Sequence, residues 1–102
     1  MEELVIPPAV FEGENSKEFI RFWIVDGRQH ISLNIGAMEN EYEVNQWGMM
    51  LADLSTHIIR GLQQDGSVDN EAVLRAKIER AYLDRLEDLE VDHTGSLLGT
   101  RQ

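Results

Sequence analysis

The dipeptide Asp26-Gly27, with a β-rich run on each side, constrains the fold of this chain most strongly. The two runs, residues 18–25 and 28–35, are rich in Ile, Val, Phe and Trp, which are typical of strands. A link of two residues of this type favours a type I′ turn, because both central residues of that turn need a positive φ. The sequence therefore predicts an antiparallel β-hairpin with Asp26-Gly27 at its tip.

The turn also predicts which residues face each other across the hairpin. The expected partners are Val25 and Arg28, Ile24 and Gln29, Trp23 and His30, Phe22 and Ile31, Arg21 and Ser32, and Ile20 and Leu33. Side chains alternate between the faces of a strand, so one face is apolar and is the predicted core face. This apolar strip consists of Ile20, Phe22, Ile24, Ile31, Leu33 and Ile35. A slip of one residue would bury polar side chains instead, so the register is strongly specified.

The opposite face of the predicted hairpin carries aromatic and basic side chains. Its candidate interaction surface, called the mixed face below, consists of Phe19, Arg21, Trp23 and His30. Trp and Arg are common anchors in protein interfaces, so the mixed face is a candidate surface for a partner or for self-association. The alternative is a cross-strand cluster that only shields the hairpin.

The segment before the hairpin is apolar but contains Pro7 and Pro8. Two prolines exclude a central strand and a helix interior. Leu4 to Ile6 is long enough for a short edge strand, which would cover one edge of the hairpin. The other edge is expected to stay open unless a second molecule pairs with it.

Two amphipathic helices are predicted after the hairpin, because apolar residues recur there at spacings of three and four. The first stripe is Val44, Trp47, Leu51, Leu54, Ile58 and Leu62, and the second is Leu74, Ile78, Ala81, Tyr82, Leu86 and Leu89. The first helix is expected to begin at a capping box, Asn40-x-x-Glu43, or at Asn45. Asp69 is the expected N-cap of the second helix. Gly48, inside the first helix, suggests a close approach by another element.

The predicted architecture is a two-layer α+β fold, in which both helices pack on the apolar strip of the hairpin. The length of the chain fits a single domain, predicted to span residues 1–89. Residues 90–102 mix Gly, Ser and Thr with little apolar content and are expected to form a flexible tail.

Charge and cysteine content narrow the classes of function. The chain has nine Lys and Arg against nineteen Asp and Glu, a formal net charge of −10, which argues against nucleic-acid and anionic-membrane partners. It has no cysteine, so disulfides, thiol catalysis and zinc–thiolate sites are excluded. The N-terminus is acidic where a signal peptide needs basic residues, and a cytoplasmic protein is expected.

Asp53 and His57 form the one polar pair with catalytic potential. They lie four residues apart in the first predicted helix and so share a face. A carboxylate beside an imidazole can orient it for acid–base chemistry. The pair lacks the nucleophile and oxyanion donors that an active site needs, so a structural hydrogen bond is the favoured interpretation. The sequence predicts no catalytic residue, cofactor or metal site, and it leaves a small enzyme or ligand-binding protein as the alternative to an interaction module.

Two stretches resemble a known family. The string Trp47-Gly48-Met49-Met50-Leu51-Ala52-Asp53-Leu54, followed by His57, and the earlier Arg21-Phe22-Trp23 are similar to small bacterial proteins, mostly alphaproteobacterial, whose function is unassigned. The resemblance covers roughly residues 5–89. It supports the predicted fold and implies no activity, substrate or cofactor.

Overall fold

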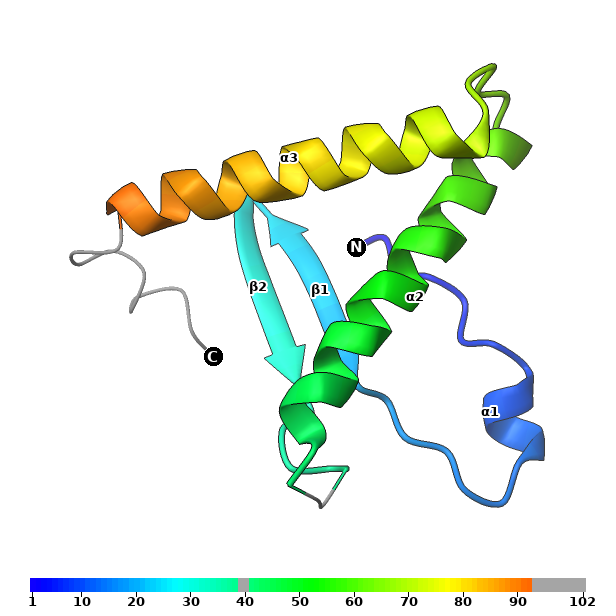
Figure 1. Cartoon of the computed structure of the whole chain (residues 1–102). Coiled ribbons are helices and arrows are strands. Elements are labelled where there is room, and N and C mark those ends of the chain that lie inside the picture. The colour runs from blue at the N-terminus through cyan, green and yellow to red at the C-terminus, as the bar shows by residue number, and fades with distance from the viewer. Residues whose placement is uncertain (39–40, 93–102) are drawn as a thin grey trace. The chain divides into compact units, whose positions relative to one another are not determined.

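The computed structural model describes residues 1–38 and 41–92. Its elements are α1 (Ala9–Glu12), β1 (Ile20–Val25), β2 (Arg28–Leu33), α2 (Glu43–Gln64) and α3 (Glu71–Asp92), as drawn in Figure 1. The α+β class is therefore confirmed: a two-stranded antiparallel hairpin plus two longer helices. The chain forms two compact units, a hairpin unit of residues 1–37 and a helix unit that begins at residue 38. A single domain over residues 1–89 stays a prediction.

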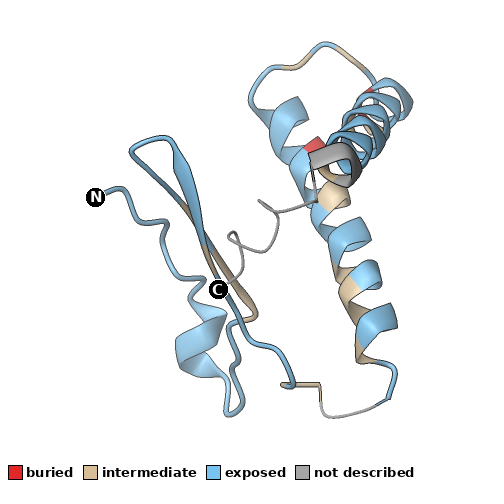
Figure 2. Ribbon diagram, turned by 90° about the vertical axis from the view of Figure 1, so that its left-hand side faces the viewer, coloured by how far each residue is buried: buried red, intermediate tan, exposed pale blue. Residues whose placement is uncertain are grey.

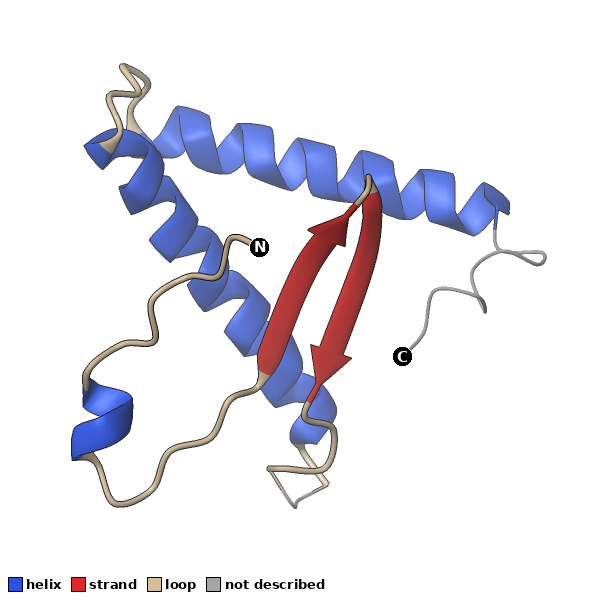
Figure 3. Cartoon of the chain, turned by 180° about the vertical axis from the view of Figure 1, so that it is seen from behind, coloured by secondary structure: helices blue, strands red, loops and turns tan. Residues whose placement is uncertain are grey.

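The hairpin has the predicted register. All six pairs, from Ile20 with Leu33 to Val25 with Arg28, are found as expected. Asp26 has a φ of 49° and Gly27 a φ of 80°, the positive values that a type I′ turn requires. The ladder continues beyond the strands, because the Asn34 N–H donates to the Phe19 carbonyl oxygen at 3.0 Å. The turn chemistry thus determines the pairing along the whole hairpin (Figure 3).

The expected third strand at Leu4 to Ile6 is not found. The sheet within the described residues has two strands, β1 and β2. Pro7 and Pro8 instead start α1, a short helix in which the Val10 N–H donates to the Pro7 carbonyl at 3.0 Å. Proline suits the first turn of a helix because its fixed φ matches the helix and its missing N–H would be unpaired there anyway.

The hairpin unit by itself does not bury the apolar strip. Phe22, Ile24, Leu33 and Ile35 are 54%, 59%, 48% and 68% exposed. Ile20 and Ile31 are half-buried, and the hairpin unit contains no buried residue (Figure 2). A two-stranded sheet has too little surface to cover its own face, so the strip needs a cover from outside the hairpin. Because the structure describes the two units separately, the packing of both helices on this strip stays a prediction.

The core of the helix unit lies where α2 and α3 meet, next to their connection (Figures 1 and 2). Ile59 is 1% exposed and Leu74 is 7% exposed, and they are the buried residues within the described part of the chain. The first stripe was predicted to bury Ile58, which is 52% exposed. Ile59, the next residue along, makes the contact instead.

The end of α2 is a Schellman motif. Gly66 has a φ of 103°, its N–H donates to the Gln63 carbonyl at 3.2 Å, and the Ser67 N–H donates to the Leu62 carbonyl at 3.0 Å. This left-handed residue satisfies carbonyls that the last helical turn leaves open and stops the helix sharply. The left-handed conformation of Gly66 is therefore the physical reason that α2 ends here.

The helix starts differ from the predicted caps. Tyr42 is the N-cap of α2 and makes no side-chain cap bond, and α2 begins at Glu43, so the alternative start at Asn45 is wrong. The first residue of the expected capping box, Asn40, lies outside the described residues. In α3 the cap is Asn70, whose Oδ1 accepts the Val73 N–H at 3.0 Å. Asp69 instead accepts a hydrogen bond from Lys77 Nζ at 2.9 Å. A carboxamide oxygen at the residue next to the helix performs the capping that was assigned to Asp69.

Two further expectations concern Gly48 and the tail. A Cβ placed on Gly48 would meet no atom of the helix unit within 4 Å, so α3 makes no close approach there. An approach by the hairpin stays a prediction. The second helix continues through Asp92, past the predicted end of the domain at residue 89. The rest of the predicted flexible tail, residues 93–102, lies outside the described residues.

Candidate functional site

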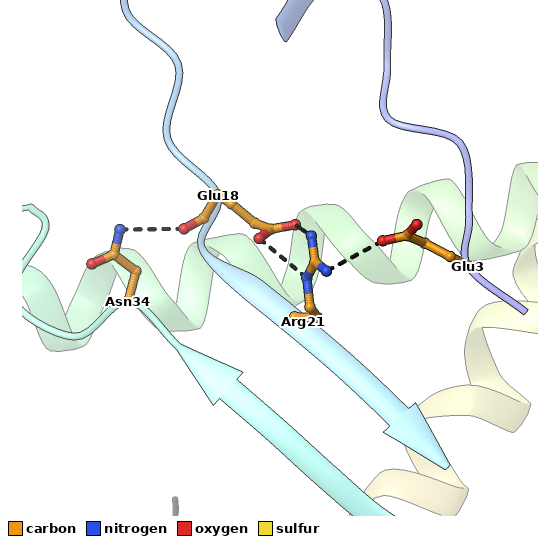
Figure 4. Close-up of polar contacts among 4 residues, drawn as sticks. All are labelled: Glu3, Glu18, Arg21 and Asn34. Atoms are coloured by element: carbon orange, nitrogen blue, oxygen red, sulfur yellow. Dashed lines mark hydrogen bonds and ion pairs between the residues drawn. The ribbon is translucent and has the colours of Figure 1, made fainter. Parts of the chain in front are cut away.

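Arg21 is the centre of the polar contacts on the mixed face (Figure 4). Its Nη2 donates to Glu18 Oε2 at 3.0 Å and its Nε to Glu18 Oε1 at 3.3 Å, which is a bidentate pairing. Its Nη1 donates to Glu3 Oε2 at 3.3 Å. The Asn34 side-chain amide donates to the Glu18 backbone oxygen at 3.2 Å, which links this cluster to the chain that follows β2.

This arrangement changes what Arg21 can do. The hydrogen bond and the charge of Glu18, helped by Glu3, raise the pKa of Arg21 above its ordinary value. With two carboxylates on one guanidinium, the positive charge of Arg21 is already compensated. Arg21 is therefore a poor receptor for an anionic ligand, and its role is to tie Glu3 of the N-terminal segment to β1.

Trp23 and His30 lie directly opposite each other, as the sequence predicts. Trp23 is half-buried, His30 is exposed, and Phe19 at the start of the hairpin is half-buried. Alternation places these side chains and Arg21 on one face of the hairpin. The structure thus brings the predicted mixed face together, and leaves His30 as its most accessible member.

A groove runs along the outer edge of β1. Its volume is about 1320 Å³, and it is lined by the N-terminal segment and by a continuous run from Ile20 to Asp26. Because consecutive residues of a strand point to opposite faces, a lining of consecutive residues means that the groove follows the strand edge. A second, smaller hollow of about 240 Å³ lies at the open end of the hairpin, between Glu18 to Arg21 and Ser32 to Asn34.

Sequence reasoning missed the carboxylates that hold Arg21. Glu18 lies three residues before Arg21, and a search for charge pairs at short spacing would have found it. Glu3 lies eighteen residues away, and no local pattern connects it to Arg21. The groove was missed for the same reason, because it depends on where the N-terminal segment lies.

Asp53 and His57 are both exposed on α2. Within the described residues no hydrogen bond or ion pair joins them. No group of three or more Asp, Glu and His side chains that could hold a metal ion is found in residues 1–38 and 41–92.

None of the described helices is both long enough and apolar enough to cross a lipid bilayer.

Comparison with known proteins gives a family and nothing finer. No curated protein matches the chain. No solved structure matches it either. One family profile matches residues 3–89, close to the range over which the sequence resembles a family of unassigned function. The match covers most of the chain, and the chain therefore belongs to the family described as Domain of unknown function (DUF5076).

Proposed function

We propose that this domain is a small acidic protein-interaction module whose contact element is the β1–β2 hairpin. The observation that carries the proposal is the exposure of large apolar side chains on a sheet that cannot cover them. Phe22 and Ile24 are both more than half exposed on the apolar strip, whereas the half-buried Trp23 lies on the opposite, mixed face. Contiguous apolar surface of this kind marks contact sites in proteins.

Charge supports the same choice of element. The chain has a net charge of −10, whereas residues 19–35 contain Arg21 and Arg28 against the single acid Asp26. Glu18 and Glu3 compensate Arg21, so Arg28 is the cationic group that the hairpin offers to a partner, and the exposed His30 adds a polar imidazole ring. An acidic body then keeps the molecule soluble, and the hairpin is the place where another protein can approach.

The alternative is an enzyme or a ligand-binding protein that uses Asp53 and His57. Both side chains are exposed on α2, and no hydrogen bond or ion pair joins them within the described residues. No observation favours this alternative over the hairpin.

The test is affinity capture from a native bacterial lysate with three immobilised forms of the full chain. They are the wild type, a mixed-face variant with Trp23→Ala and His30→Ala, and a helix variant with Asp53→Asn and His57→Gln. Truncation of an interface anchor costs about 2 kcal/mol or more, so specific proteins should fall about 10-fold or more with the mixed-face variant. They should be retained by the helix variant. Equal capture by the mixed-face variant, with its fold verified by circular dichroism, would contradict the proposal.

A further inference from the structure

The outer edge of β2 carries a row of backbone groups that point away from β1. Val25 with Arg28 flanks the turn, and the Asn34 N–H bonds to the Phe19 carbonyl, so these are hydrogen-bonded pairs of the ladder. Such pairs alternate with pairs that do not bond. The N–H and C=O groups in between therefore face outward; they belong to Gln29, Ile31 and Leu33. Within residues 1–38 and 41–92, none of them makes a backbone hydrogen bond on that side.

The two edges of the hairpin differ. The N-terminal segment borders the edge of β1, where the bond from Arg21 to Glu3 holds it (Figures 1 and 4). Proteins protect exposed edges with Pro, Lys, bulges or charges on the strand. β2 reads Arg-Gln-His-Ile-Ser-Leu: it has no Pro, its register is unbroken, and its one charged residue, Arg28, lies at the end next to the turn. The edge of β2 is thus open for pairing, whereas that of β1 is bordered by the chain itself.

We propose that β2 pairs antiparallel with β2 of a second copy of this chain. The two-fold axis passes through Ile31, which then faces the partner's Ile31. All three outward-pointing residues of β2 become hydrogen-bonded in this register, because Gln29 faces the partner's Leu33 and Leu33 faces the partner's Gln29. A contact of this kind is self-complementary, as two-fold symmetry requires.

Charge favours a second copy at this edge. Two chains of net charge −10 repel each other, so they can approach closely only where acids are absent. Residues 28–35 contain no acid. In the proposed register Arg28 faces the partner's Asn34 and His30 faces the partner's Ser32, so no like charges oppose each other. At physiological salt, charges beyond roughly 8 Å are largely screened, which leaves this local pattern decisive.

The pairing also explains how an open hairpin becomes a stable sheet. Three or more strands with an apolar face are needed for independent stability. Two paired hairpins form a four-stranded sheet, and the two apolar strips become one continuous face. The inference rests on the proposed function in taking the hairpin as the contact element, and it names a second copy as the occupant of the β2 edge.

Sedimentation of the full chain tests the pairing. The apparent mass of the wild type should rise from 11.7 kDa toward twice that value as the protein concentration increases from about 10 µM to about 1 mM. Dissociation constants of weak dimers fall in this range of concentration. Gln29→Pro removes an outward N–H and should keep the chain at the monomer mass. Gln29→Ala keeps the N–H and is the matched control, which should still dimerise. A wild type that stays monomeric at all concentrations overturns the inference.

The absence of cysteine allows a test of register that does not depend on proline. Ile31→Cys places two thiols opposite each other across the axis, at about 5.5 Å between Cα atoms, within the range of a disulfide. Under mild oxidation it should form a covalent dimer about 10-fold or more faster than Gln29→Cys, which faces the partner's Leu33. The control is Val68→Cys at a fully exposed position of the helix unit. Equal rates for the three variants overturn the register.

The outcomes separate the two proposals. A monomeric wild type whose lysate partners depend on Trp23 and His30 contradicts the β2 pairing and leaves the interaction module standing. A dimer that is lost in Gln29→Pro, with no lysate partner that depends on the mixed face, supports the pairing and contradicts the mixed face as a contact surface for other proteins.

Discussion

The hairpin unit and the helix unit are ordered by different forces. In residues 1–37 the order comes from a turn, a backbone ladder and exposed ion pairs, and no side chain is buried. In the helix unit the order comes from two helices closed on Ile59 and Leu74, with a Schellman motif at the bend. Local chemistry is therefore enough to shape the hairpin, but burial must come from outside it. The following predictions test how far this difference extends.

The largest effect is expected at the buried contact of the helix unit. Ile59→Ala should lower the free energy of unfolding by about 2–5 kcal/mol, because it removes buried methyl groups and leaves a cavity. Its neighbour Ile58, 52% exposed, is the matched control, and Ile58→Ala should cost about 1 kcal/mol or less. Urea denaturation followed by circular dichroism measures both. Similar losses for the two variants would show that the buried face of α2 has been assigned to the wrong residue.

The two tryptophans show whether the units unfold together. Trp23 lies in the hairpin and Trp47 in α2, so Trp23→Phe and Trp47→Phe each leave one fluorescent reporter. We expect Ile59→Ala to shift the midpoint seen by either reporter equally, because a two-stranded hairpin is marginal by itself. Coincident transitions support one domain over residues 1–89. If Ile59→Ala does not shift the midpoint reported by Trp23, the hairpin and the helices unfold as independent units.

A smaller effect, opposite in sign between the units, is expected when glycine is replaced by alanine. Gly27→Ala should destabilise the chain by about 1–2 kcal/mol, because a φ of 80° is strained for any residue with a Cβ. Gly48→Ala should stabilise it by up to about 1 kcal/mol, since the new methyl group meets no atom and alanine favours the helix. Thermal unfolding measures the two shifts. A loss of stability at Gly48 would reveal a neighbour that packs against α2 there.

The smallest effect concerns the start of α3. Asn70→Ala should cost about 1 kcal/mol, because it removes the oxygen that accepts the Val73 N–H. Asp69→Ala breaks only the exposed ion pair with Lys77 and should cost about 0.5 kcal/mol or less. Urea denaturation of the two variants side by side checks the order. A larger loss of unfolding free energy for Asp69→Ala than for Asn70→Ala would show that Asp69 is the N-cap, as predicted from the sequence.

The sequence predicts well those structural features that depend on residues close together in the chain. The register of the hairpin follows from Asp26-Gly27 and the alternation of side chains, because both act over a few residues. The existence of two helices follows from their apolar spacing. The same spacing could not separate Ile58 from Ile59, because adjacent residues lie only about 100° apart on a helix and the contacting face depends on the other helix.

The candidate site shows the same division. Alternation brings Trp23 opposite His30, and this needs only the turn. The compensation of Arg21 by Glu3 could not be predicted, because it depends on a segment eighteen residues away that has no strand partner. What covers the apolar strip stays a prediction, since an apolar pattern indicates that a surface needs to be covered and does not say which element covers it.

The two-residue link at the hairpin tip has a consequence for insertions. A link of three residues can keep Val25 opposite Arg28 when it forms a type I turn followed by a left-handed residue, so one added residue should be tolerated where Gly or Asn stands at that position. A link of four or five residues can do the same when it is built around a type I turn. The length of the tip can therefore change provided that its residues suit the new turn, because the face of every side chain depends on the pairing of Val25 with Arg28.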